Sequence, residues 1–193
     1  MSPRTKEQNE SIRTERKSLI EEAALEVFAE DGYHAASISK IAKKAGVAKG
    51  TIYTYFESKE QLLKELIRDV ITDVMKRIDV PMDKDLKDED VIKFINGSLD
   101  IVKESPQRWR LFFEVFLQKD VMALMMVEMM KMAEMFMVPF VNYFESKGHE
   151  DAPDRTRYFH AIIDGVQMQL MMSPGEFPLE SVKKMIIKQF VES

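Results

Sequence analysis

Apolar residues recur along most of this chain at the three- and four-residue spacing of amphipathic helices. The first such stripe consists of Leu19, Ile20, Ala23, Ala24, Val27 and Phe28. Gly32 follows this stripe and is the expected helix end, because glycine tolerates the left-handed conformation of a helix cap. Residues 1–10 are polar and are expected to form a frayed arm. Because no segment shows the alternating pattern of a strand, the predicted fold class is all-α.

Two short helices are predicted after Gly32. Ser37 is the expected cap of the first, Gly46 is expected to end it, and the second should end near Phe56. Their apolar positions are Ile41, Ala42, Ala45, Val47, Ile52 and Phe56. Two short helices joined through a glycine are typical of a helix-turn-helix, whose second helix enters the major groove of DNA.

A longer helix is predicted next, because Ser58 and Gln61 have the spacing of a capping box. Pro81 lies just beyond its expected end, and the polar residues 81–90 are a plausible linker. The chain is therefore divided into a helix-turn-helix domain with its arm at 1–57, a connecting helix at 58–80, and a helical bundle for ligand binding and dimerisation at 81–193.

Further helices are expected in the last part near Val91, from Ser105-Pro106, from Val121, from Pro153 and from about Pro178. The run from Val121 to about Phe144 has Asp120 as its expected cap and Pro139 as a possible kink. It is long enough to span a membrane, but charged residues interrupt it at three-residue spacing. The interrupting residues are Glu128, Lys131 and Glu134. A buried helix is therefore favoured, and no membrane partner is expected.

Charge is distributed unevenly along the chain. The net charge is −5 over 193 residues, which by itself argues against a nucleic-acid partner. Between Tyr33 and Lys59, however, five lysines stand against the single acid Glu57, so a basic module can sit on an acidic body. With no cysteine and no apolar stretch at the N-terminus, a reducing cytoplasm is the expected location.

The stretch from Ser37 to Leu63 closely resembles the TetR family of bacterial regulators. The matching residues are Ile41-Ala42, Ala45-Gly46-Val47, Lys49-Gly50-Thr51-Ile52-Tyr53, Tyr55-Phe56, Lys59 and Leu62. The DNA-contacting residues that the resemblance implies are Ser37, Ser39, Lys49, Gly50, Thr51, Tyr53, Tyr55 and Lys59. The two serines and Lys59 are expected on phosphates, the residues from Lys49 to Thr51 near bases, and the tyrosines on the DNA backbone.

Several alternatives stay open in this motif. Ala48 stands where many relatives have a capping Ser or Thr, so the recognition helix is expected to be less well anchored. Tyr55 either contacts DNA or packs against the first helix. Lys43 and Lys44 are either solvated or attract DNA diffusely.

Methionines mark the expected effector domain. Eight of them fall between Met122 and Met137, and they indicate either a soft core or a plastic ligand pocket. The candidate pocket residues are Trp109, Phe113, Phe116, Met126, Met129, Met130, His160, Asp164, Gln167 and Met168. In the family the last two helices form a dimer. The apolar residues available here for core and interface are Ile162, Ile163, Val166, Leu170, Val182, Met185, Ile186 and Phe190.

The sequence thus predicts a homodimeric regulator, expected to be a repressor that an apolar or amphipathic small molecule releases from a palindromic double-stranded DNA operator. The alternative is a helical interaction protein that keeps the fold and acts through protein partners. An enzyme is not expected, because the three histidines are widely separated and cysteine is absent. For the same reason no metal and no cofactor are expected.

Overall fold

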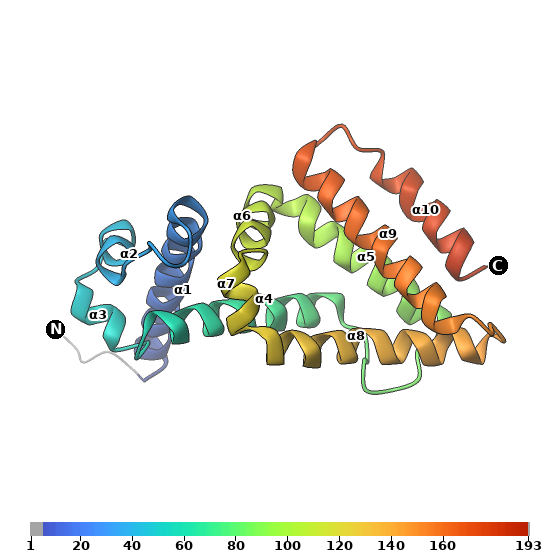
Figure 1. Cartoon of the computed structure of the whole chain (residues 1–193), viewed down its shortest axis with the longest axis horizontal. Helices are drawn as coiled ribbons and strands as arrows, with labels where there is room; N and C mark the ends of the chain where they lie inside the picture. The colour runs from blue at the N-terminus through green and yellow to red at the C-terminus, as the bar shows by residue number, and fades with distance from the viewer. Residues whose placement is uncertain (1–5, 193) are drawn as a thin grey trace. The chain divides into compact units, whose positions relative to one another are not determined.

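The computed structural model describes residues 6–192, and within them the chain forms ten helices and no strand (Figure 1). The helices are α1 (Lys6–Asp31), α2 (Ile38–Lys44), α3 (Lys49–Tyr53), α4 (Lys59–Ile78), α5 (Asp88–Glu104), α6 (Pro106–Phe116), α7 (Lys119–Leu124), α8 (Met126–Ser146), α9 (Ala152–Met172) and α10 (Leu179–Phe190). The expected all-α class is confirmed. No helix among the described residues is both long and apolar enough to cross a membrane.

The chain divides into two compact units. The first unit comprises Met1–Val70 and Leu111–Leu124, and the second comprises Ile71–Arg110 and Met125–Ser193. Helices α4 and α6 therefore each contribute residues to both units. The three-part division at residues 57 and 80 stays a prediction.

The first unit is built on apolar side chains from α1 to α4. Its fully or almost fully buried residues include Ile20, Ala24, Phe28, Ile41, Ile52, Phe56, Leu62 and Leu63. Helices α2 and α3 have only seven and five residues, and helices this short are not stable alone in water. The burial of Ile41 and Ile52, worth about 1.5–3 kcal/mol for each such side chain, therefore holds the two short helices in place.

Local signals account for the helix ends in this unit. Ser37 Oγ accepts a hydrogen bond from the Lys40 N–H at 3.2 Å, as a cap of α2 should. Gly32 and Gly46 have φ angles of +78° and +65°, which glycine adopts without strain. Ser58 Oγ caps α4 through the Gln61 N–H at 3.0 Å. Ala48, as expected, gives α3 no side-chain cap.

Two helix boundaries differ from the expectation. Helix α1 begins at Lys6, so residues 6–10 are helical and only residues 1–5 of the expected arm lie outside the described residues. Lysine, glutamate and glutamine in this stretch are good helix formers. Helix α3 ends at Tyr53 rather than near Phe56, because Thr54 closes the turn through its hydroxyl on the Thr51 carbonyl at 2.6 Å.

The single helix expected from Val121 to Phe144 is wrong. The structure has α7 and α8 there, with Met125 between them. The break coincides with the boundary between the two units, so α7 belongs to the first unit and α8 to the second. Asp120 accordingly lies inside the first turn of α7 rather than capping a longer helix.

An aromatic cluster forms the core of the second unit, where α5, α8, α9 and α10 meet. Phe140 stacks on Phe159 with ring centroids 5.0 Å apart, and Phe94 meets Phe140 edge-on at 4.8 Å. Phe159 in turn meets Phe190 of α10 at 5.1 Å. Such pairs add roughly 0.5–1.5 kcal/mol each beyond area burial. The bundle expected in the last part of the chain is confirmed.

Candidate nucleic-acid interface

The outer face of α3 carries the exposed side chains of the motif. Ile52 is fully buried, whereas Lys49, Gly50 and Tyr53 are exposed, Tyr53 to 51%. Thr51 is half-buried. A Cβ built on Gly50 would meet no atom of the described residues within 4 Å, so packing within this part of the chain does not require glycine there. The face that α3 presents is therefore polar, aromatic and open to close approach.

The two serines lie at the start of α2. Ser37 uses a lone pair of its hydroxyl to cap α2, and its O–H remains a donor. Ser39 is exposed. Both serines are thus placed at the helix N-terminus, where free N–H groups also favour an anion.

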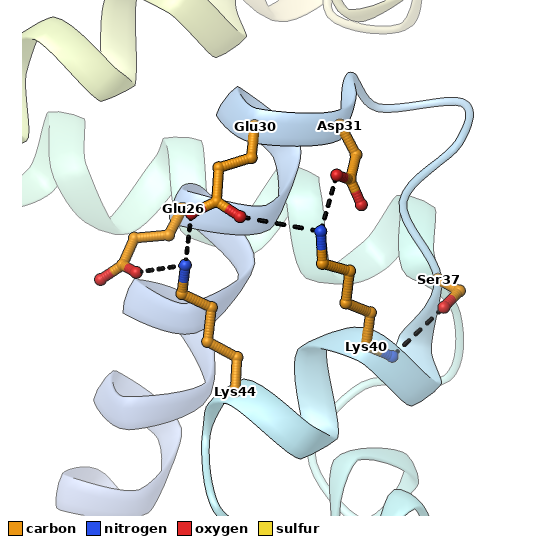
Figure 2. Close-up of polar contacts among 6 residues, drawn as sticks. All are labelled: Glu26, Glu30, Asp31, Ser37, Lys40 and Lys44. Atoms are coloured by element: carbon orange, nitrogen blue, oxygen red, sulfur yellow. Dashed lines mark hydrogen bonds and ion pairs between the residues drawn. The ribbon is translucent and has the colours of Figure 1, made fainter.

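Lys40 and Lys44 of α2 are paired with the carboxylates of α1, as Figure 2 shows. Lys44 Nζ lies 2.6 Å from oxygens of both Glu26 and Glu30, and Lys40 Nζ lies 2.6 Å from Asp31. Hydrogen bonds to Asp31 raise the pKa of Lys40, and those to Glu26 and Glu30 raise the pKa of Lys44. Their charges are therefore balanced within the protein.

Two exposed lysines of the motif have no carboxylate to balance their charge within the described residues. Lys43 and Lys49 are exposed, and within residues 6–192 neither has a carboxylate at ion-pairing distance. The five lysines between Tyr33 and Lys59 are indistinguishable in charge from the sequence alone. The spacing of Glu26 and Glu30 on α1 was the signal that two of the lysines would be neutralised.

Lys59, at the start of α4, is turned inward. Its Nζ donates hydrogen bonds to the main-chain carbonyls of Tyr33 (2.7 Å), His34 (3.0 Å) and Ala36 (2.8 Å). It also lies 4.6 Å from the centroid of the Tyr33 ring, and burial lowers the pKa of its ammonium. An ammonium has three N–H groups, so all its donors are used within the protein. The phosphate contact expected of Lys59 would compete with these bonds and stays a prediction.

Tyr55 is half-buried and faces the first helix. The guanidinium carbon of Arg13 lies 5.8 Å from the centroid of its ring, a distance at which a cation is attracted to the ring face. This placement corresponds to the second of the two alternatives open for Tyr55. Its contact with DNA stays a prediction.

A cluster of charged side chains connects α1 to α4. Lys17 Nζ lies 2.6 Å from Asp69, 3.2 Å from Glu65 and 3.3 Å from Glu21. Burial raises the pKa of the Glu21 carboxyl to about 7, against the opposing effect of the Lys17 ammonium. Three carboxylates therefore share one ammonium.

We expect Glu21 to make stability depend on pH. Its pKa is about 7 in the folded protein against 4.5 as the ordinary value, so the folded state binds the proton more tightly. The stability from this group is complete below about pH 4.5 and falls as pH rises through about 7. Glu21→Gln stays uncharged, so it should gain about 1–2 kcal/mol over the wild type between pH 5 and pH 8 in urea unfolding.

The matched control is Glu15→Gln, an exposed position on the same helix, which should change the unfolding free energy equally at both pH values. If Glu21→Gln also shows the same difference at both, Glu21 is ionised throughout and the cluster does not titrate.

The candidate ligand residues fall in different surroundings. Phe113 and Phe116 of α6 lie in the first unit, beside Phe112 at ring distances of 6.0 and 5.8 Å. In the second unit Trp109 Nε1 donates to the Ile101 carbonyl at 3.1 Å. Met126, Met130 and Met168 are 61%, 69% and 51% exposed, and Met129 is half-buried.

The polar candidates lie along α9. His160 meets Phe140 edge-on at 5.0 Å, and burial lowers the pKa of its imidazole to about 4. Its Nε2 is buried and has no hydrogen-bond partner among the residues that the structure describes. Gln167 Nε2 donates to the Ser98 carbonyl at 3.1 Å. Asp164 lies between His160 and Gln167 in the sequence of α9. The shared pocket stays a prediction.

Part of this chain is similar in sequence to known bacterial regulatory proteins. Residues 20–66 match the family model described as bacterial regulatory proteins, tetR family. The fatty acid metabolism regulator protein of Bacillus subtilis (strain 168) is 46% identical over 74 residues, which are 38% of this chain and 36% of that protein. The transcriptional activator FasR of Mycolicibacterium smegmatis is 31% identical over 110 residues, 55% of this chain and 49% of that protein. The chain thus matches less than half the length of these relatives.

Solved structures share the fold over nearly the whole chain. FadR from Bacillus subtilis, solved in complex with stearoyl-CoA, superposes with a TM-score of 0.70 at 22% identity, over 90% of this chain and 97% of that one. The fatty acid degradation regulator FadR from Bacillus halodurans superposes with a TM-score of 0.66 at 23% identity, over 91% and 94%.

The sequence match covers the helix-turn-helix region, and the structural match extends the same fold to the C-terminal bundle. These relatives are named as regulators, which agrees with the expectation that the chain is not an enzyme. The chain thus resembles bacterial regulatory proteins of the TetR family in sequence over residues 20–66, and it shares its overall fold with solved regulators.

Proposed function

We propose that this protein is a ligand-responsive transcriptional regulator that binds a double-stranded DNA operator through α2 and α3. The observation that carries the proposal is the open outer face of α3, with Lys49, Gly50 and Tyr53 exposed on a helix whose Ile52 is buried. Gly50 is not required by packing within the described residues. Its lack of a side chain instead suits close approach of the helix to a base or phosphate.

The proposed contacts are of two kinds: contacts to phosphates that position the protein on DNA, and contacts to bases that recognise the sequence. Ser37 and Ser39 at the start of α2 would bind phosphates and set the register of the protein on the duplex. Lys43 and Lys49 would supply the positive charge that the ion pairs of α2 leave available. Thr51 and Tyr53 would lie nearest to the base edges in the major groove.

A second copy of this chain is the proposed partner on α9 and α10. Many apolar residues of these two helices are buried in the core of the second unit and are not available to a partner. They are Ile163, Val166, Leu170, Ile186 and Phe190. The large apolar residues left exposed are Tyr158 (52%), Met168 (51%), Met172 (70%) and Met185 (67%). Apolar residues grouped on one side of a helix mark an interaction surface. A two-fold dimer presents two recognition helices, so the operator should be an inverted repeat and its occupation should repress transcription.

The proposed effector is a long-chain fatty acyl-CoA. The relatives that match this chain include a fatty acid metabolism regulator, and one neighbour in fold was solved with stearoyl-CoA. An acyl chain is apolar and its CoA group is polar, which agrees with the amphipathic ligand expected for the methionine-rich bundle. Binding should shift the dimer toward an arrangement with lower DNA affinity.

Stearoyl-CoA tests this effector directly. In a fluorescence anisotropy titration with a duplex selected from random DNA, it should raise the Kd for DNA by roughly 5- to 150-fold. Free CoA and a simple detergent of equal chain length are the controls. Binding of stearoyl-CoA without a change in DNA affinity would contradict the effector proposal. A protein with no salt-sensitive DNA complex would instead support the alternative that it acts through protein partners.

A further inference from the structure

The side chain of Gln118, between α6 and α7, closes the end of α1. Its Oε1 accepts a hydrogen bond from the Tyr33 N–H at 2.7 Å, and its Nε2 donates to the Phe28 carbonyl at 2.9 Å. Phe28 lies in the last turn of α1, and Tyr33 directly follows the helix-ending Gly32. Gln118 thus satisfies one acceptor and one donor of the same helix end.

An amide side chain is well suited to this pair of contacts. The acceptor and the donor sit on separate atoms of one planar group, which a carboxylate or an ammonium cannot provide. A second bond from Nε2 to the Glu114 carbonyl at 3.3 Å holds the side chain against its own helix. All these groups belong to the first unit, to which residues 111–124 contribute.

The loop that Gln118 closes is also held from the opposite end of the motif. Lys59 of α4 binds the carbonyls of Tyr33, His34 and Ala36, and His34 Nε2 lies 3.1 Å from Asp120 of α7. Ser37, which follows Ala36 in the sequence, caps α2. The loop between α1 and α2 is therefore bound by α4 and by the α6–α7 segment, and it ends at the first residue expected on DNA.

We propose that Gln118 is a positioning residue that sets the α1–α2 loop and makes DNA affinity depend on the α6–α7 segment. This segment is continuous in sequence with the second unit at both ends. An effector that binds the second unit and displaces residues 111–124 would therefore act on the α1–α2 loop. A shift that breaks the two amide contacts frees the end of α1 and the start of α2 together. The regulatory arm of this inference rests on the proposed function, whereas the positioning arm does not.

The test compares Gln118→Met with the wild type in the full-length protein. Methionine keeps the length and helix preference of glutamine but removes all three hydrogen bonds of its side chain. Without ligand or DNA, exchange of the Tyr33 amide should become at least 10-fold faster by NMR. DNA affinity should fall roughly 5- to 10-fold, and the ratio of Kd values with and without stearoyl-CoA should fall toward one. Gln118→Glu, which keeps the acceptor, should retain the protection of Tyr33. Gln107→Met, an exposed position on α6, is the matched control and should change none of these quantities.

The outcomes are separable. Unchanged protection of Tyr33 in Gln118→Met overturns the inference. Weaker DNA binding with an unchanged Kd ratio shows that Gln118 is only structural and overturns the regulatory arm. If stearoyl-CoA leaves the wild type on DNA, the effector proposal fails, while the exchange and the ligand-free affinity still decide whether Gln118 positions the loop.

Discussion

Lys59→Met should destabilise the protein by about 3 kcal/mol, because it removes three hydrogen bonds worth about 1 kcal/mol each. The carbonyls of Tyr33, His34 and Ala36 would all lose the same donor. For a chain of this size the loss corresponds to a melting temperature lower by about 6–12 °C. DNA affinity should fall for every sequence, because the loop that leads into α2 is no longer held.

The matched control is Lys64→Met, slightly more than one turn further along α4. Lys64 pairs with Glu60 at 2.7 Å on the helix surface, so its loss should cost less than about 0.5 kcal/mol. Thermal unfolding followed by circular dichroism distinguishes the two variants. If Lys59→Met melts like the wild type and reduces only the salt dependence of DNA binding, Lys59 contacts a phosphate in the DNA complex. Its hydrogen bonds to the loop carbonyls would then not stabilise the fold.

The double change Lys43→Ala with Lys49→Ala should have the largest effect on DNA binding itself. These are the two exposed lysines in the described part of the motif that have no carboxylate partner. Removing two phosphate contacts from each subunit should flatten the slope of log K against log salt by about 4 per dimer. At about 0.1 M salt the loss of affinity should be roughly 100- to 1,000-fold. The fold should be unaffected, since neither lysine is buried.

The control for charge alone is Lys84→Ala with Lys93→Ala, two exposed lysines that lie outside the motif and outside α9 and α10. This variant has the same net charge but lies away from the motif in the sequence, and its salt slope should equal that of the wild type. Anisotropy titrations between about 50 and 200 mM salt measure both slopes. An equal flattening in the two variants would show that overall charge, and not α2 and α3, governs association.

The local features of the fold were predictable because each depends on a few neighbouring residues. The cap at Ser37, the turns at Gly32 and Gly46, and the burial of Ile52 all follow from short-range stereochemistry and helical periodicity. The break at Met125 was not predictable in this way. Methionine is a good helix former, and the interruption coincides with the boundary between the two units, which residues distant in the sequence define.

The site was predictable as a set of exposed positions but not as a set of partners. Gln118 bonds to groups 85 and 90 residues away in the sequence, and Lys59 bonds to carbonyls more than 20 residues away. Main-chain carbonyls carry no signature of their own in the sequence. A lysine that binds them therefore looks the same as a lysine that binds phosphate until the fold is known.

Selection of bound duplexes from random DNA tests the central claim most directly, because it requires both a DNA-binding motif and a symmetric dimer. The full-length protein should enrich one inverted repeat whose half-sites are separated by one or more helical turns, and Lys43→Ala with Lys49→Ala should abolish the enrichment. Enrichment of a site without two-fold symmetry would contradict the proposed dimer. No enriched sequence in any salt concentration would contradict the claim that α2 and α3 recognise DNA.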